Sequence, residues 1–180
     1  TETEGGTVLM GGSTDVDAAF EWMIDRAGGG DFVVIRVTGE DGYNSYIYDM
    51  GGLNSVETIV INTVNSANNL GVYNRIKNAE ALFIAGGDQW NYVNIWKGTL
   101  VEDAINYLIN EKHVPVGGTS AGEAIMGDAY FDAMNGTVTS EGALNNPYKD
   151  RVSIQYDNFI ENPWLENTIC DQHYIGREGR

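Results

Sequence analysis

Residues 114–126 read VPVGGTSAGEAIM. An apolar run typical of a strand leads into Gly118-x-Ser120-x-Gly122 and then into a stretch typical of a helix. This is the pattern of a nucleophile elbow, a sharp strand-to-helix turn that lifts a serine clear of a sheet. The strained serine backbone needs small neighbours, which Gly118 and Gly122 supply. Ser120 is therefore the candidate nucleophile, and an ordinary glycine-rich turn is the alternative.

The rest of the chain alternates between apolar, β-branched runs and segments with helical spacing. We expect helices over 16–26 and 100–110, and strands over 7–10, 32–37, 58–61, 81–85 and 114–116. Such alternation predicts one α/β domain over residues 1–180, with a mostly parallel sheet covered by helices on both faces. Ligands then bind at the carboxyl ends of the strands, where the glycine pairs 11–12, 86–87 and 117–118 are expected.

Composition and charge exclude several classes of function. The 10 Lys and Arg residues against 26 Asp and Glu residues give a net charge of -16, which repels nucleic acid and anionic lipid. No apolar run is long enough to span a membrane. One cysteine and two histidines leave little material for a disulfide or a zinc site, so neither metal nor cofactor is expected. The acidic, Asn- and Gly-rich composition slightly favours a secreted or periplasmic protein over a cytoplasmic one.

Residues 81–89 form the second segment of interest, a buried strand that ends in Gly86-Gly87-Asp88-Gln89. The Ala121 N–H is the first candidate donor to an oxyanion, and N–H groups of Gly87 and Asp88 are candidates for the second. Gln89 is placed to hydrogen-bond substrate. The alternative is an ordinary loop in which Asp88 caps the next helix.

The third segment, Cys170-Asp171-Gln172-His173-Tyr174, contains the candidate general base. His113 precedes a strand and is expected on the surface, so we assign this role to His173. Arg177 has a planar, charged fork suited to a substrate carboxylate, and a surface ion pair is the alternative.

A serine and a histidine need an acid that fixes the imidazole tautomer. We choose Glu141, in the loop TSEG of residues 139–142, with Asp132 and Asp150 as alternatives. Asp171 has little room to reach back to the ring of His173, so we expect it to be structural or to face substrate.

Three segments, GGDQ at 86–89, GTSAG at 118–122 and DQHY at 171–174 followed by Arg177, resemble the signature segments of the cyanophycinase-like serine peptidases, peptidase family S51, relatives of dipeptidase E. The resemblance implies a flavodoxin-like or class I glutamine-amidotransferase-like sheet, a Ser-His-Glu triad and no cofactor. It also implies hydrolysis next to aspartyl residues, as in cyanophycin cleaved to β-aspartyl-arginine, and a homodimer. On that model Gln89, Gln172 and Arg177 hold the dipeptide that becomes the acyl group.

Two departures qualify this resemblance. Relatives have a small residue where this sequence has Glu123, and a carboxylate one helical turn from Ser120 would alter the pocket or raise the pKa of a neighbouring acid. Relatives also continue for several strands beyond the position of Arg180. We therefore expect either a truncated chain or a cleaved one, whose separate C-terminal fragment completes the sheet.

Two other functions stay open. One is an aspartyl dipeptidase or other exopeptidase that uses the same triad on short peptides. The other is a non-catalytic domain that binds a peptide or glycan through the aromatic residues Trp90, Tyr92, Trp96 and Trp164.

Overall fold

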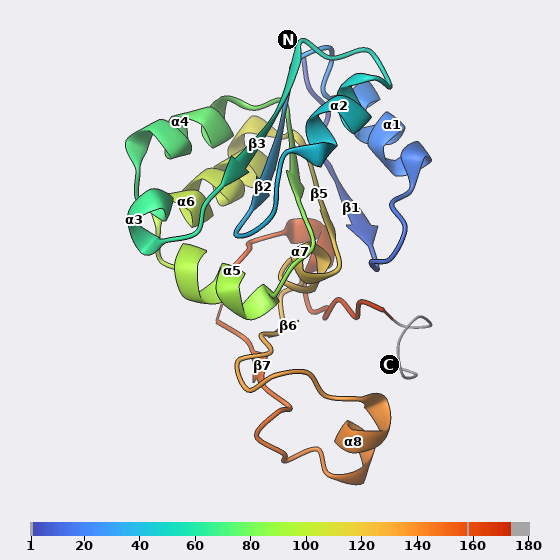
Figure 1. The fold of residues 1–180 in the computed structure, drawn as a ribbon, viewed down its shortest axis with the longest axis vertical. Helices are drawn as coiled ribbons and strands as arrows, with labels where there is room; N and C mark the ends of the chain where they lie inside the picture. The colour runs from blue at the N-terminus through green and yellow to red at the C-terminus, as the bar shows by residue number, and fades with distance from the viewer. Residues whose placement is uncertain (1, 158, 174–180) are drawn as a thin grey trace.

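A five-stranded parallel sheet forms the centre of the computed structural model, which describes residues 2–157 and 159–173 (Figure 1). The strand order is β1-β5-β4-β2-β3, with every neighbouring pair parallel. The strands are β1 (Gly6–Met10), β2 (Asp31–Arg36), β3 (Ser55–Val60), β4 (Ala81–Ile84) and β5 (Pro115–Thr119). The predicted parallel α/β sheet is therefore confirmed.

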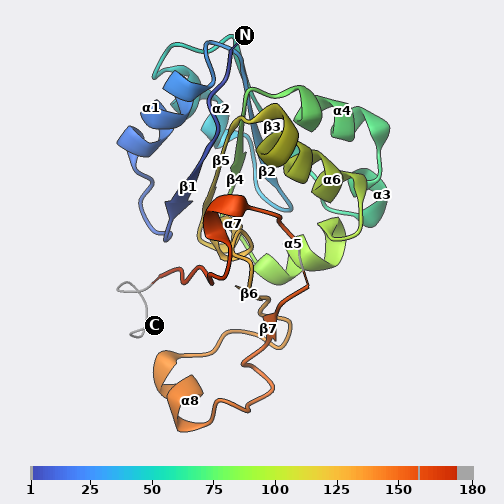
Figure 2. The same ribbon diagram turned by 180° about the vertical axis from the view of Figure 1, so that it is seen from behind.

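Helices cover both faces of the sheet (Figures 1 and 2). Alternate residues of β4 show the two layers, because Phe83 packs in one hydrophobic cluster and Leu82 and Ile84 pack in the other. One face carries α1 (Asp17–Arg26) and α2 (Gly42–Tyr48). The other carries α3 (Val64–Ala67), α4 (Leu70–Asn78), α5 (Gln89–Trp96) and α6 (Leu100–Tyr107). No helix among the described residues is long and apolar enough to cross a membrane.

The structure corrects two of the expected boundaries. The expected helix over 100–110 is α6 followed by the π-helix η1 (Leu108–Lys112). Gly117 and Gly118 were expected in a loop but lie inside β5, where they pair with Val8 and Leu9 of β1. A Cβ atom on Gly117 would lie 3.0 Å from both the Met23 sulfur and the Val8 Cβ, so helix and strand pack closely against this glycine.

The chain after the sheet forms a smaller lobe at the carboxyl edge. It contains α7 (Ala121–Ala124), β6 (Tyr130–Phe131), α8 (Ser140–Asn145), β7 (Ile154–Gln155) and the 3₁₀-helix η2 (Pro163–Leu165). β6 and β7 pair antiparallel, and α8 projects away from the sheet (Figure 1). Phe159 and Ile160 are buried in the core beside α6. They anchor the end of this lobe to the main body.

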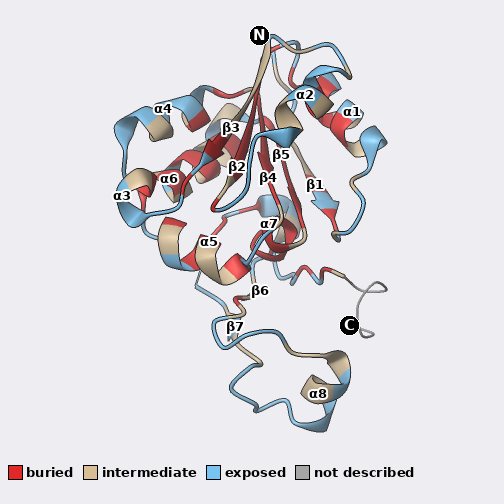
Figure 3. Cartoon of the chain, in the orientation of Figure 1, coloured by how far each residue is buried: buried red, intermediate tan, exposed pale blue. Residues whose placement is uncertain are grey.

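Figure 3 shows that the buried residues concentrate in the sheet and on the inner sides of its helices. The core residues of β2 and β4 are almost fully buried, with burial patterns iBBBBi and BBBB. Strands that are apolar on both faces are typical of a sheet sandwiched between helices. The buried centre gives the loops at the carboxyl edge a rigid base.

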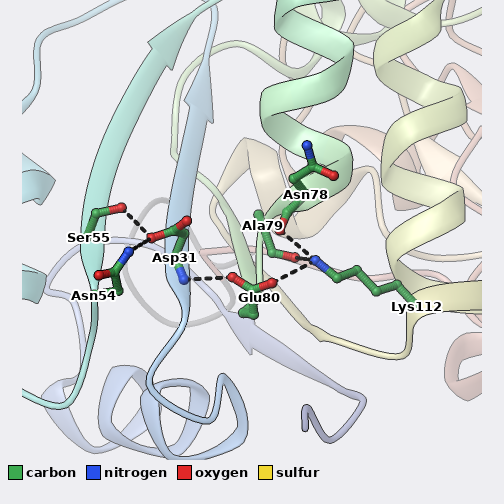
Figure 4. A network of polar contacts seen from close by, with 7 residues as sticks. All are labelled: Asp31, Asn54, Ser55, Asn78, Ala79, Glu80 and Lys112. Carbon is green, nitrogen blue, oxygen red and sulfur yellow. Dashed lines mark hydrogen bonds and ion pairs between the residues drawn. The ribbon is translucent and has the colours of Figure 1, made fainter. Parts of the chain in front are cut away.

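The opposite, amino edge of the sheet is held by a polar network (Figure 4). Lys112 Nζ donates to Glu80 Oε1 at 2.9 Å and to the Ala79 carbonyl at 2.8 Å. Glu80 Oε2 accepts from the Asp31 N–H at 2.8 Å, and the Asp31 carboxylate accepts from Ser55 Oγ and Asn54 Nδ2. These two side-chain hydrogen bonds lower the pKa of Asp31. The network joins the starts of β2, β3 and β4 at the edge away from the candidate site.

Candidate active site

Ser120 lies at the turn between β5 and α7, at the carboxyl edge of the sheet. Its backbone has φ 51° and ψ −113°, a left-handed conformation that is strained for a non-glycine residue. The Ser120 N–H donates to the Met10 carbonyl at 2.9 Å, which anchors the turn to the end of β1. The geometry is that of the strand-to-helix elbow that the sequence pattern predicts.

The two glycines of the elbow are needed because the chain packs on itself. A Cβ on Gly118 would lie 2.4 Å from the Gly122 carbonyl carbon, and one on Gly122 would lie 2.1 Å from the Ile84 carbonyl oxygen. Both distances are far below any real contact, so neither position accepts a side chain. α7 therefore lies directly against the end of β4.

His173 completes a pair with Ser120. Its Nε2 lies 2.8 Å from Ser120 Oγ, within hydrogen-bond distance, although 53 residues separate the two in the chain. The His173 N–H donates to the Gly11 carbonyl at 2.8 Å. Because Ser120 is bonded to Met10 and His173 to Gly11, the end of β1 sets the positions of both residues.

Gly12 gives the imidazole its space. A Cβ on Gly12, which has φ +104°, would lie 2.5 Å from His173 Cε1 and 2.7 Å from Nε2. The ring therefore packs flat against the backbone of this glycine. The glycine pair 11–12 was expected to lie near the site, but its part in positioning the histidine is visible only in the structure.

The turn at Gly86 and Gly87 lies on the other side of Ser120. A Cβ on Gly86 would lie 3.5 Å from Ser120 Cβ, so the turn packs closely against the nucleophile. The buried Tyr92 hydroxyl braces it, lying 2.7 Å from the Ala85 carbonyl and 3.0 Å from the Gly86 carbonyl. Burial raises the pKa of Tyr92 far above its usual value, so this hydroxyl stays a donor at all physiological pH.

Two hollows meet at Ser120 and His173. The smaller has a volume of about 270 Å³, and its walls include Gly87, Asp88, Gln89 and Gln172. The larger, of about 490 Å³, is lined by Gly12, Ser13, Asp15, Arg36, Tyr43, Gly86 and Thr119, besides Ser120 and His173. The structure thus brings most of the expected site residues into the smaller hollow, whereas sequence reasoning did not find the charged residues of the larger one.

The side chains expected to contact substrate differ in how firmly they are held. Gln89 and Gln172 are both buried, and Gln89 Nε2 donates to the Phe131 carbonyl at 3.4 Å. Asp88 caps α5, since its Oδ1 accepts from the Trp90 N–H at 3.0 Å. This contact uses the side chain, so the backbone N–H of Asp88 remains a candidate donor to the oxyanion. Arg177 lies outside the described residues.

The candidate acids are scattered around the pair. Glu141 is exposed in α8 and lines neither of the two hollows that meet at Ser120. Asp132 is fully buried, but its carboxylate already accepts from the Met134 N–H and from Gln155 Nε2. Asp150 and Asp171 are both exposed. The structure therefore gives Asp132 a structural role at the base of the lobe.

Glu123, the departure noted in the sequence, is buried in α7 one turn after Ser120. Only 7% of its surface is exposed, and Oε2 has no hydrogen-bond partner in the described part of the chain. Burial, aided by the negative charge of Asp171, raises the pKa of Glu123 itself. A Cβ on Gly11 would lie 3.8 Å from both Glu123 Oε2 and the His173 backbone nitrogen, so this carboxyl group lies close to the segment that holds the histidine.

The aromatic residues do not form a binding platform. Tyr92 and Trp96 are buried and stack on each other with their ring centroids 4.4 Å apart. Trp96 Nε1 donates to the Ile61 carbonyl in the core. Trp164 is exposed but belongs to η2, which is separate from α5. The fold uses Tyr92 and Trp96 for packing, and the partly buried Trp90 packs against the same core, so the four residues do not form one exposed aromatic surface.

A parallel α/β sheet with a strained serine and a hydrogen-bonded histidine at its carboxyl edge is the arrangement found in the class of serine hydrolases. No group of three or more His, Cys, Asp or Glu side chains that could hold a metal ion was found in residues 2–157 and 159–173.

Comparison with protein families identifies the particular group within this class. The model described as peptidase family S51 matches residues 36–144, which is more than half of the chain and includes Ser120. The chain therefore belongs to peptidase family S51, whose members are serine peptidases. A comparison with curated proteins found no match.

Solved structures show the same architecture. A peptidase from an acI-B1 actinobacterium superposes with a TM-score of 0.59 at 16% sequence identity, over 72% of this chain. The chain covers 59% of the length of that peptidase. At this identity the likeness shows the fold alone, and it agrees with the class I glutamine-amidotransferase-like architecture of family S51.

Proposed function

We propose that this chain is a serine peptidase that works through an acyl-enzyme, with Ser120 as nucleophile and His173 as general base. The observation that carries the proposal is the 2.8 Å distance between Ser120 Oγ and His173 Nε2. Membership of family S51 supports the same chemistry. In this reading Nε2 is unprotonated in the resting enzyme and accepts the hydrogen bond from the serine hydroxyl.

The reaction follows from this arrangement. His173 takes the Ser120 proton as Oγ attacks the scissile carbonyl carbon, and the carbonyl oxygen becomes an oxyanion. The Ala121 N–H and the N–H groups of Gly87 and Asp88 are our candidates to bind it, since they lie on either side of Ser120. His173 then protonates the leaving amine. Water, deprotonated by the same histidine, hydrolyses the acyl-enzyme and releases Ser120.

Glu141 remains our candidate for the acid that orients His173. Its neighbours Thr139 and Ser140 line a hollow together with Asp171 and Gln172, so this turn lies beside the segment that carries the histidine. Its exposure is the main argument against the assignment, because a triad carboxylate is usually shielded from water.

The substrate that we propose is an aspartyl peptide, with a cyanophycin-like polymer of aspartate and arginine as the specific candidate. Gln89 and Gln172 in the smaller hollow supply amide groups for the acyl part, and Arg177 is assigned to the same task from the signature segment alone. The net charge of -16 favours the approach of an arginine-bearing polymer. An aspartyl dipeptidase is the second candidate, because the same groups accept a short substrate.

The test is hydrolysis of cyanophycin and of a panel of β-aspartyl and α-aspartyl dipeptides, with products identified by mass. We expect cleavage by the wild-type protein and a loss of at least about 1,000-fold in kcat for Ser120→Ala. Release of β-aspartyl-arginine from the polymer supports the cyanophycin candidate, and cleavage of dipeptides only supports the dipeptidase. If Ser120→Ala cleaves as fast as wild type, the nucleophile is wrongly assigned.

A second variant tests the assignment of Glu141 as the acid of the triad. Glu141→Gln lowers kcat by roughly 100-fold or more if Glu141 orients His173. Wild-type kcat in this variant would exclude the residue from the triad.

A further inference from the structure

The larger of the two hollows has no assigned ligand in the proposed mechanism. With a volume of about 490 Å³ it falls within the range of roughly 300–1,000 Å³ typical of small-molecule sites. Among residues 2–157 and 159–173, Ser120 and His173 alone line both hollows. If the smaller hollow takes the acyl part of the substrate, the larger one lies on the side of the leaving group.

Arg36, the last residue of β2, is in the wall of this larger hollow. Ion pairs with carboxylates hold Arg26, Arg75, Lys97 and Lys112, in keeping with the large excess of acidic residues. Across the described residues, no carboxylate pairs with Arg36. Lys77, Lys149 and Arg151 also form no ion pair in the described part of the chain, but none of them lines either hollow at Ser120. Arg36 is therefore the cation without a carboxylate partner that lies next to the nucleophile, where its guanidinium is suited to bind an anionic group of the substrate.

The guanidinium is held in place by the backbone. Its Nε donates to the Thr38 carbonyl at 2.6 Å, and Nη1 donates to the Glu40 carbonyl at 3.0 Å. A Cβ on Gly39, which has φ +109°, would lie 2.4 Å from Nη2, so the loop after β2 wraps closely around the group. Because the two carbonyls are neutral acceptors, they orient the guanidinium without cancelling its charge.

Asp15 is the acidic residue of the same wall, and it is already engaged. Its Oδ2 accepts from the Tyr43 hydroxyl at 2.9 Å. The Arg36 guanidinium carbon lies 5.9 Å from the centre of the Tyr43 ring. The neutral Tyr43 hydroxyl fixes the Asp15 carboxylate without cancelling its charge, and Arg36 is the positively charged residue in the described part of this wall.

We propose that the larger hollow binds the leaving-group part of the substrate and that Arg36 binds its free carboxylate. This inference rests on the proposed peptidase function and adds the residue that recognises the leaving group, whose free carboxylate follows the scissile bond. Arg36 is then a specificity residue that recognises the acid and discriminates against the neutral amide.

The test measures binding to a protein that cannot cleave. Ser120→Ala is titrated by calorimetry at pH 7 with Asp-Ala, with its C-terminal amide, and with Asn-Ala. The amide removes the carboxylate on the leaving-group side, whereas Asn-Ala removes the one on the acyl side. We expect Asp-Ala to bind roughly 10- to 100-fold more tightly than its C-terminal amide, the usual range for a charge-assisted hydrogen bond.

Adding Arg36→Met to Ser120→Ala should bring this ratio to about 1 while leaving the ratio of Asp-Ala to Asn-Ala unchanged. Adding Lys77→Met instead is the matched control, because it removes one positive charge from α4, away from the hollow, and should leave both ratios unchanged. Arg36→Lys keeps the charge but loses the planar fork, so it should lower the first ratio several-fold. If the Arg36→Met variant does not fold, the Arg36→Lys variant provides the test.

An acid-to-amide ratio that survives in both Arg36 variants overturns the inference, and so does a protein that binds acid and amide equally or binds neither. Failure of the peptidase proposal gives a different result, in which the wild-type protein cleaves no peptide while the binding ratios still depend on Arg36. Cleavage that depends on Ser120 but shows no effect of Arg36 overturns this inference alone.

Discussion

The alignment of Ser120 and His173 depends on Gly12. The imidazole of His173 occupies the space that a side chain at position 12 would need. Gly12→Ala would place a methyl group 2.5 Å from Cε1 and 2.7 Å from Nε2, so the ring has to shift from its position at Ser120. We expect kcat/KM to fall by about 100-fold, the order of loss that follows a displacement of about 1 Å. The measurement is steady-state hydrolysis of the best substrate from the panel.

Gly51→Ala is the control for this variant. Gly51 has φ +83°, so alanine there meets a similar backbone strain, but no atom lies within 4 Å of its Cβ position. It should lower the melting temperature to a similar degree and leave kcat/KM unchanged. Equal kcat/KM for Gly12→Ala and wild type would mean that the histidine needs no such alignment.

Glu123 is a single side chain that makes the free energy of unfolding depend on pH. Its folded-state pKa is raised by burial and by Asp171, so the folded protein holds this proton more tightly than the unfolded chain does. The stabilisation is complete below the unfolded pKa and is lost as pH rises through the folded one. Glu123→Gln removes this titration, so we expect the free energy of unfolding to fall less steeply between about pH 4 and 8 than it does in the wild type.

The comparison needs a carboxylate that is not buried. Glu21→Gln makes the same change of charge on the exposed surface of α1, and its denaturation curves should follow the wild type at every pH. Identical pH dependence in Glu123→Gln and wild type would show that the buried carboxyl group is solvated or paired.

At the scale of elements, the two edges of the sheet have separate tasks. The carboxyl ends of β1, β2, β4 and β5 carry the residues around Ser120, while the network of Lys112 and Glu80 joins the amino ends of β2, β3 and β4. Lys112→Met leaves the half-buried Glu80 carboxylate and the Ala79 carbonyl without this donor. We expect a loss of about 1–3 kcal/mol in the free energy of unfolding, measured by urea denaturation, with kcat unchanged.

Lys149→Met provides the reference, because Lys149 is exposed and forms no ion pair within residues 2–157 and 159–173. Its free energy of unfolding should stay within about 0.5 kcal/mol of wild type. A large fall in kcat for Lys112→Met at a temperature where the variant is folded would contradict the separation of the two edges.

At the scale of the whole molecule, local patterns determined much of the fold. Apolar runs of β-branched residues between glycines indicate buried strands wherever they occur, so all five strands of the sheet were located. The elbow was equally visible, because its serine and glycines lie in one short segment, where the Cβ position of Gly118 is crowded by Gly122 and Glu123. These features depend on neighbours in the chain or on a periodicity that any stretch of sequence shows.

The tertiary structure decided what distant segments do to one another. Gly12 and His173 are 161 positions apart, and nothing in either segment shows that the glycine is there to admit the imidazole. Arg36 ends an ordinary strand, and only the strand order, which places β2 beside β4, brings it into the hollow that reaches Ser120. Sequence alone determined the strands of the sheet, helices α1 and α6 and the elbow at the candidate serine, because short-range sterics and burial are encoded locally. The shape and charge of the surrounding site required the fold, because they come from side chains that meet only when the sheet assembles.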